Sequence, residues 1–237
     1  FLQNMSHDIR TPMNAVLGFT DLALQAGDDT VKVQDYLSKI RISGNHLLGI
    51  VNEVLEISRI ESGQTKLDET VCSLWDIVNE TDIIIRDQAL KKKQDFTIDL
   101  WKVQDLYIWC DKLRVKEILV NLLGNSVKYT QAGGNISLQI IQVPCEKQNY
   151  GNYEIHVKDN GCGMSQEFLK KIFEPFERQA NSTISGIQGT GLGMTIIKGF
   201  VDAMGGTIDI RSEENKGTEI IVRLCQKTAD PPVKQNK

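Results

Sequence analysis

The chain of 237 residues is 41% hydrophobic and 24% charged, with a formal net charge of −4, an ordinary composition for one or two globular domains. Its mild negative charge and lack of a long basic run argue against a general nucleic-acid-binding protein. The five cysteines and three histidines lack metal-ligand spacings, which favours reduced thiols in a cytoplasmic protein over a disulfide framework or a zinc site. No apolar run of membrane-spanning length is present. Because the chain begins inside a helical pattern, we expect a piece of a longer protein, whose upstream parts would supply any inner-membrane anchor.

The first predicted helix runs to about Ala26 and carries a heptad pattern. Apolar side chains recur every seven residues in two series, namely Leu2, Ile9, Val16 and Ala23, and Met5, Pro12, Phe19 and Ala26. This pattern is typical of a helix packed lengthwise against other helices. His7 falls opposite the seam, with Asp8 beside it and Thr11 one turn later. The pattern thus predicts an exposed histidine with a carboxylate neighbour, although a lone surface histidine is more often an ordinary solvated residue.

A second helix is predicted after the turn at 27–29 and ends near Gly63. Its apolar seam alternates steps of four and three residues, through Val33, Leu37, Ile40, Gly44, Leu47, Val51, Val54 and Ser58. Two helices joined by a short turn form an antiparallel hairpin whose long apolar stripe needs a cover. We expect a homodimer in which two hairpins form a four-helix bundle. A monomer whose second domain covers the stripe is the alternative.

A small, polar segment separates the hairpin from a mixed α/β pattern. We predict a hairpin domain at 1–61, a hinge at 62–66, a second domain at 67–226 and a tail at 227–237. Strands are predicted at 67–72, 96–100, 106–110, 136–143, 153–158, 207–211 and 218–224, and helices at 74–90, after Asp111 and at 193–204. This order favours a two-layer α/β sandwich. The expected helical core residues are Trp75, Val78, Ile84, Ile85, Val115, Ile118, Leu119, Leu122 and Leu123.

The helix at 121–129 is the first of three stretches that suggest a nucleotide site. Asn121, Asn125 and Lys128 lie at i, i+4 and i+7, so their polar ends share one face while leucines face the core. A carboxamide oxygen suits Mg²⁺, and a lysine supplies a point charge for phosphate. An amphipathic helix with a polar outer face would give the same pattern.

Two glycine-rich stretches complete the set. Residues 159–163 (DNGCG) follow a predicted strand, where glycine permits close backbone approach to a flat ligand and an ionised Asp159 can accept a hydrogen bond from an amine such as that of adenine. Residues 189–194 (GTGLGM) lead into a helix, whose N-terminal amides form an anion site. The polar segment 178–188 between them predicts a lid. Each stretch alone is weak evidence, but the three together indicate nucleotide binding.

The chain resembles, over nearly its whole length, the catalytic core of a bacterial two-component sensor histidine kinase. Residues 6–12 (SHDIRTP) resemble the H box of that family. Four further boxes of the family, named N, G1, F and G2, resemble residues 121–129, 159–163, 173–176 and 189–193, and Gly217-Thr218 resembles the last element of the site. The resemblance implies an ATP-binding domain of the gyrase, Hsp90, histidine kinase and MutL type, with ATP and Mg²⁺ as cofactors.

The resemblance also implies roles for single residues. His7 would be the phosphoacceptor, Asp8 its base, and Thr11 would orient water during phosphatase activity. Asn125 would be the Mg²⁺ ligand and Asp159 would bind adenine. The other residues implied at the nucleotide site are Asn121, Lys128, Tyr129, Gly161, Gly163, Met164, Phe173, Phe176, Arg178, Gly189, Thr190, Gly191, Leu192, Gly193 and Thr218.

The expected activity is ATP-dependent autophosphorylation of His7, followed by transfer to an aspartate of a response regulator receiver domain, with a companion phosphatase activity. Three residues depart from the usual family pattern: Asp8 is often Glu, and Ser126 and Met194 stand where Ala and Leu are more usual, with no expected consequence for the latter two. The tail fits either a C-terminus or a connection to a receiver domain in a hybrid kinase.

Two other functions fit parts of the pattern. A dimeric scaffold could bind ATP or a response regulator without phosphorylating itself. An ATP-gated clamp such as Hsp90 or MutL would share the nucleotide site, but clamps lack an upstream H-box hairpin and carry a catalytic carboxylate where this chain has Asn121. Failure to incorporate phosphate would favour the scaffold, and steady ATP hydrolysis without a phosphoprotein would favour the clamp.

Overall fold

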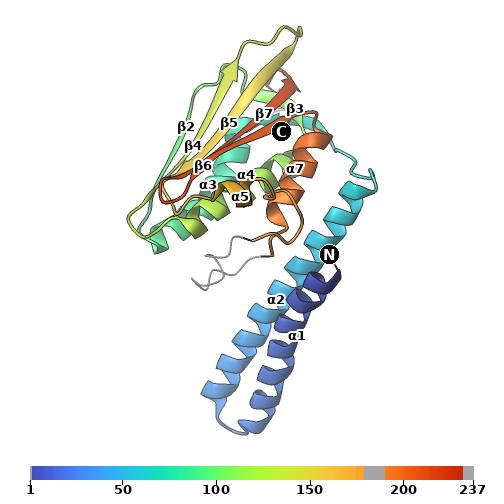
Figure 1. The fold of residues 1–237 in the computed structure, drawn as a ribbon, viewed down its shortest axis with the longest axis vertical. Helices are drawn as coiled ribbons and strands as arrows, with labels where there is room; N and C mark the ends of the chain where they lie inside the picture. Colours follow the sequence, from blue (N-terminus) through green and yellow to red (C-terminus); the bar gives the residue numbers. More distant parts are fainter. Residues whose placement is uncertain (1, 179–189, 232–237) are drawn as a thin grey trace, which may run out of the picture.

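The computed structural model describes residues 2–178 and 190–231 and consists of a helical hairpin that carries an α/β domain at one end (Figure 1). Helix α1 spans Leu2–Gln25 and helix α2 spans Thr30–Glu61. The side chain of Asp29 caps α2 by accepting a hydrogen bond of 3.2 Å from the Lys32 amide, as N-terminal caps commonly do. The predicted hairpin is confirmed.

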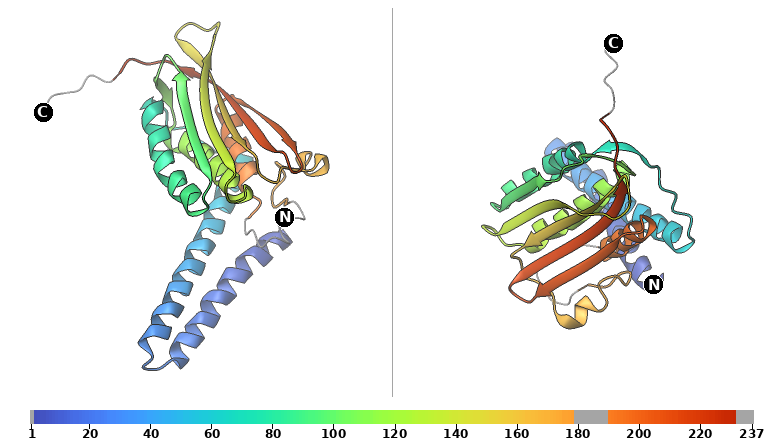
Figure 2. Two further views of the ribbon diagram at one scale, coloured as in Figure 1. Left: turned by 90° about the vertical axis from the view of Figure 1, so that its left-hand side faces the viewer. Right: turned by 90° about the horizontal axis from the view of Figure 1, so that it is seen from above.

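A five-stranded sheet in the order β2-β4-β5-β7-β6 forms one layer of the α/β domain, and helices cover one of its faces (Figure 2). Only β2 and β4 are parallel; the other neighbouring strands are antiparallel. Strands β1 (Thr70–Ser73) and β3 (Tyr107–Cys110) form a separate pair. The remaining elements are α3 (Leu74–Lys91), β2 (Asp95–Lys102), α4 (Lys112–Tyr129), β4 (Asn135–Val143), β5 (Tyr150–Asp159), α5 (Gln166–Leu169), α7 (Gly193–Ala203), β6 (Thr207–Glu213) and β7 (Gly217–Lys227). The predicted two-layer sandwich is confirmed.

The core lies between the sheet and helices α3, α4 and α7. All five core residues predicted on α4 are buried, as are Val78 and Ile85 of α3. Trp75 and Ile84 were predicted in the core, but they are 52% and 38% exposed. The buried stripe of α3 runs through Leu74, Ile77, Val78, Thr81, Ile85 and Ala89. Helical geometry therefore turns the predicted pair away from the sheet despite their apolar side chains.

Some strand boundaries also differ from the prediction. Strand β1 begins at Thr70 and not at 67, because the Asp68 amide donates to the Asp111 carboxylate at 3.0 Å and only residues 70–73 pair with β3. Strand β5 begins at Tyr150, three residues earlier than predicted, because it pairs with β7 along its whole length. The strand boundaries thus follow backbone pairing, which can begin later or earlier than the apolar pattern indicates.

The hairpin contacts the α/β domain where the C-terminal half of α2 packs on α7. Ile57 is 1% exposed in this contact, and Glu56 forms an ion pair of 3.0 Å with Arg114. The helices approach closely at Gly199, where an added Cβ would lie 2.6 Å from the Ile60 side chain. Within the described part of the chain, no helix has both the length and the apolar character needed to cross a bilayer.

Candidate nucleotide and phosphoacceptor site

Strand alternation places two of the predicted residues side by side at one end of the sheet. Along β5, Tyr153, Ile155 and Val157 point to the core and are buried. Since side chains alternate along a strand, Asp159 continues this inward series. Its register partner on β7 is Thr218, which lies in the inward series of that strand. Both residues line a cavity of about 1230 Å³ that opens between the sheet, α4 and α2.

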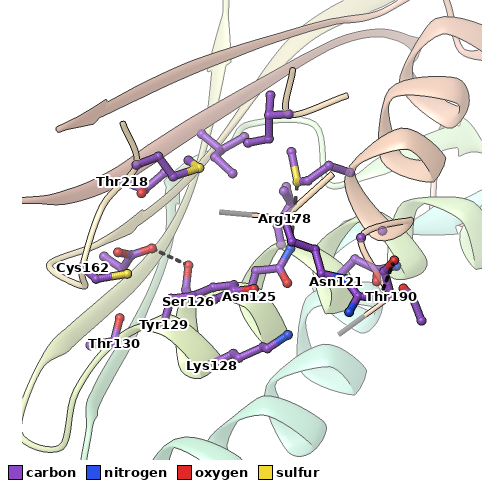
Figure 3. A pocket seen from close by; sticks show the side chains of 18 of the residues that line it. Asn121, Asn125, Ser126, Lys128, Tyr129, Thr130, Cys162, Arg178, Thr190 and Thr218 are labelled. Carbon is purple, nitrogen blue, oxygen red and sulfur yellow. Dashed lines mark hydrogen bonds between the residues drawn. The ribbon is translucent and has the colours of Figure 1, made fainter. Parts of the chain in front are cut away.

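Three donors hold the Asp159 carboxylate in this cavity. The Gly161 amide donates to one oxygen at 2.9 Å, the Ser126 hydroxyl donates to the other at 2.9 Å, and the Thr218 amide adds a backbone hydrogen bond. Figure 3 shows the Ser126 contact as a dashed line. Burial raises the pKa of Asp159, and these donors act against that rise. The expectation that Ser126 has no consequence is therefore wrong, because its hydroxyl holds a central carboxylate.

The polar face of α4 lines the same cavity. Asn121, Asn125 and Lys128 all face it, as their spacing predicts (Figure 3). The Asn121 amide nitrogen donates to the Glu117 carbonyl at 2.9 Å, and the Asn125 amide nitrogen lies 3.9 Å from the Met194 sulfur. The sequence did not predict this contact between Met194 and Asn125.

These contacts bear on whether the site suits Mg²⁺. Because protein atoms engage both amide nitrogens, the carboxamide oxygens of Asn121 and Asn125 are the atoms left for the cavity, and such hard oxygens fit Mg²⁺ carried by a nucleotide. Among the described residues, no group of three His, Cys, Asp or Glu side chains could hold a metal by itself. The donors therefore fit an ion that takes most of its ligands from phosphate and water.

Two cationic side chains of the cavity, Lys128 and Arg178, repel each other, and Glu53 acts against this effect on Lys128. Burial and the nearby Arg178 guanidinium lower the pKa of Lys128, because both disfavour its ammonium form. Arg178 donates to the Thr190 carbonyl at 3.1 Å. A bound phosphate would offset the repulsion between the two cations, so this part of the cavity suits an anion.

The glycine-rich loop reaches the cavity through Thr190, Gly191 and Gly193. Gly191 adopts a φ of +74°, and an added Cβ would lie 2.8 Å from the Phe176 backbone. The Phe176 amide donates to the Gly191 carbonyl at 3.1 Å. Gly189 and residues 179–188 of the lid predicted at 178–188 lie outside the described residues.

Of the other predicted residues, Tyr129, Gly163 and Met164 line the cavity, whereas Gly161, Phe173, Phe176 and Leu192 do not. Phe176 and Leu192 are buried, the Phe173 carbonyl accepts a hydrogen bond of 3.0 Å from Thr195, and Gly161 binds Asp159 through its amide. The sequence therefore did not distinguish the residues that line the cavity from those that do not.

The H box adjoins the cavity through Arg178, which lines the cavity and contacts Asp8. The His7 side chain is 79% exposed, as predicted, and its Nδ1 lies 3.4 Å from one oxygen of Asp8. The other Asp8 oxygen accepts a hydrogen bond from Arg178, and the Thr11 hydroxyl donates to the His7 carbonyl at 3.1 Å. Arg178 thus connects the predicted nucleotide site to the residue next to the predicted phosphoacceptor.

Helix α2 supplies a wall of the cavity that the sequence did not predict, through Asn45, His46, Gly49, Ile50 and Glu53. Burial raises the pKa of Glu53, while a hydrogen bond with Thr190 acts against that rise. The spacing of these residues gives one helical face, but the sequence does not indicate that the second domain folds back onto it.

Comparison with known proteins finds two family models that match separate parts of the chain. Residues 1–63 match the His Kinase A (phospho-acceptor) domain, and residues 110–228 match the histidine kinase-, DNA gyrase B-, and HSP90-like ATPase family. This chain is a sensor histidine kinase core. The sensor histidine kinase GacS of Pseudomonas protegens is 36% identical over 97% of this chain, and BarA of Escherichia coli is 34% identical over 92%.

The histidine kinase core spans about a quarter of these relatives, 25% of GacS and 23% of BarA. Among solved structures, ShkA in complex with AMPPNP is 26% identical, with a TM-score of 0.70 over 98% of this chain and 47% of ShkA. AdeS of Acinetobacter baumannii is 21% identical, with a TM-score of 0.67 over 92% of this chain and 96% of AdeS, which shows a shared fold.

Proposed function

We propose that this chain transfers the γ-phosphoryl group of ATP to His7 and then passes it to an aspartate of a response regulator receiver domain. The proposal rests on two contacts of Arg178. Its guanidinium donates to the Thr190 carbonyl at the cavity and to the carboxylate of Asp8, the residue next to His7. One chain thereby combines a candidate nucleotide site with an exposed histidine whose neighbour Asp8 contacts a residue of that site. ATP is abundant in the cytoplasm, where we propose that this region acts.

The geometry supports one orientation of ATP. Adenine fits the sheet end of the cavity, where the Asp159 carboxylate would accept from its exocyclic amine. The phosphates then extend toward Asn121, Asn125 and Lys128. Mg²⁺ held by the Asn125 oxygen would neutralise charge on the phosphates. Lys128 and Arg178 would bind phosphate oxygens, which removes their mutual repulsion.

The histidine is arranged to act through its Nε2 atom. An Asp8 carboxylate that accepts from Nδ1–H would favour the tautomer whose Nε2 lone pair is free to attack phosphorus. As the N–P bond forms, the bond between the γ-phosphorus and its bridging oxygen breaks and ADP leaves. Arg178 holds the opposite Asp8 oxygen, so it would fix the orientation of this carboxylate.

Residues 62–66 lie between the helical hairpin and the α/β domain. We propose that residues 62–66 act as a hinge between domains at 1–61 and 67–226, because the ATP-binding domain must move to present phosphate to His7.

Large apolar side chains of the hairpin, including Leu17, Leu37 and Leu48, are more than 50% exposed. A homodimer would cover them, and sedimentation equilibrium at twice the chain mass would test it.

Labelling with γ-³²P-ATP and Mg²⁺ tests the kinase proposal. We expect an acid-labile, alkali-stable label in the original chain and none in His7→Ala, because phosphohistidine has this stability pattern. His156→Ala is the matched control, since His156 lies on the sheet far along the chain from the H box and should keep the label. A label retained in His7→Ala would mean that another residue is the nucleophile.

The same labelled protein can be used to test phosphotransfer to a receiver domain and the phosphatase activity. ThkA, a solved histidine kinase, has been captured with the response regulator TrrA, which supports a receiver domain as the partner of this chain. Mixing labelled chain with a receiver domain should move the label to the regulator. Thr11→Ala should slow its later loss if Thr11 orients water. If no label forms although ATP binds, the non-catalytic scaffold becomes the better function.

Replacing Ser126 by alanine is expected to weaken ATP binding about 3- to 10-fold, since one hydrogen bond is worth about 0.5–1.5 kcal/mol. Loss of the hydroxyl removes a donor that favours the ionised form, so the pKa of Asp159 should rise further. The carboxylate would then be lost at a higher pH during acidification, and the defect should grow between pH 8 and pH 5. Calorimetric titration across this range measures it. Ser137→Ala on β4 is the control, and a defect independent of pH would contradict the role.

A further inference from the structure

Two solvent-accessible cysteines that are distant in sequence meet at the end of the sheet remote from the nucleotide cavity. The sulfurs of Cys145 and Cys225 lie 3.8 Å apart although 80 residues separate them. Cys225 is exposed on β7, and Cys145 is half-buried in the connection between β4 and β5, which lies at the top of Figure 1.

Strand register explains the contact. Asn152 of β5 is the register partner of both Val143 on β4 and Cys225 on β7. The Asn152 side chain donates to the Pro144 carbonyl at 3.0 Å, which holds the connection over β5. Cys145 follows immediately, so its side chain reaches across the middle strand to β7. Backbone pairing and a side-chain hydrogen bond therefore fix the encounter.

Packing does not account for these thiols. Cys72 and Cys110 are buried and belong to the core, which is the usual structural use of a free cysteine. Cys145 and Cys225 lie outside that core. The sulfur separation of 3.8 Å must shorten to the disulfide bond length of about 2.05 Å for the pair to be linked.

We propose that Cys145 and Cys225 form a redox modification site that peroxides oxidise to an intramolecular disulfide. One thiolate attacks a peroxide oxygen, which breaks the O–O bond and gives a sulfenic acid and, after proton uptake, water. The second thiol attacks that sulfur and displaces a second water. Two thiols and one hydrogen peroxide thus give one disulfide and two waters. The thiols are oxidised and the peroxide is reduced.

The site is separate from the nucleotide cavity. Asn152 and Asp159 lie seven residues apart on β5, or roughly 23 Å at about 3.3 Å per residue. The disulfide would close a covalent loop that contains β5, α7 and β6, which restricts the unfolded chain. Oxidation should therefore raise the melting temperature, by roughly 5–10 °C, and leave ATP affinity within twofold.

Oxidation of the reduced chain with one equivalent of hydrogen peroxide tests the proposal. Thiol titration should show two thiols lost per chain, and non-reducing peptide mass spectrometry should find Cys145 linked to Cys225 with a loss of 2 Da. Dithiothreitol should restore both thiols and the original melting temperature. Burial and Cys145 raise the pKa of Cys225, so the reaction should be faster at higher pH.

Matched variants make the result decisive. Cys145→Ser and Cys225→Ser should each abolish the linked peptide and the rise in melting temperature. Cys162→Ser should retain both, because Cys162 is exposed at the nucleotide cavity and not beside the pair. A disulfide between chains, a linkage to Cys162, or sulfinic acid without linkage would each overturn the proposal.

Discussion

Replacing Asp159 by asparagine is expected to weaken ATP binding about 10- to 100-fold and to leave the fold intact. The asparagine oxygen can still accept from Gly161, and its amide nitrogen can donate to a reoriented Ser126 hydroxyl. That nitrogen would then present a donor where the adenine amine needs an acceptor. An unpaired buried donor costs about 1–3 kcal/mol, and about 1.4 kcal/mol corresponds to tenfold in affinity. Isothermal titration with ATP and Mg²⁺ measures the loss.

The same substitution should not reduce stability at neutral pH. Burial raises the pKa of Asp159 above its ordinary value, so the folded protein holds this proton more tightly than the unfolded chain. The ionised group therefore costs stability above its folded pKa, and this cost disappears as the pH falls below the ordinary value. Asparagine carries no such cost, so we expect an equal or higher melting temperature at pH 7.

A control separates the lost acceptor from a general change of charge. Asp209 pairs with Arg223 on the sheet, and Asp209→Asn removes a carboxylate outside the cavity. It should bind ATP as the original chain does. If Asp159→Asn bound ATP within threefold of the original, adenine would not lie on this carboxylate. A collapse of its melting temperature would instead indicate a structural role.

Replacing Gly163 by alanine is expected to lower the melting temperature by roughly 5–15 °C and to weaken ATP binding. Gly163 has a φ of +63°, and an added Cβ would lie 1.9 Å from the Glu213 carbonyl oxygen. The left-handed conformation costs a non-glycine residue about 1–2 kcal/mol, and overpacking typically adds about 1–3 kcal/mol. To relieve the overlap, the turn after β5 must move away from the end of β6, and Asp159 lies four residues before it.

Gly205 provides a matched control for this prediction. Its φ of +67° is nearly the same, but an added Cβ would meet nothing within 4 Å. Gly205→Ala should therefore show the conformational cost alone, with a smaller fall in melting temperature and unchanged ATP affinity. Equal effects of the two substitutions, measured by thermal melts with and without ATP, would show that the contact with Glu213 does not matter.

The sequence predicted the architecture because each element carries a local signal. The heptad seam of the first helix, the Asp111 cap and the apolar series on α4 depend only on residue spacing, and all describe the structure correctly. The faces of His7, Asn121 and Asn125 follow from helical periodicity in the same way. The predicted core positions of Trp75 and Ile84 were wrong, because an apolar side chain alone does not indicate which side of a helix the sheet covers.

The tertiary structure alone decided which residues act together. Ser126 and Asp159 lie 33 residues apart, and Arg178 and Asp8 lie 170 apart, so no local pattern links either pair. The α2 wall of the cavity and the contact between Cys145 and Cys225 likewise depend on how the domains and strands are arranged. The position of a residue in the sequence fixes the face of the helix or strand that its side chain occupies, because backbone geometry sets the repeat of each element. What the face meets depends on packing between distant segments, which only the folded chain determines.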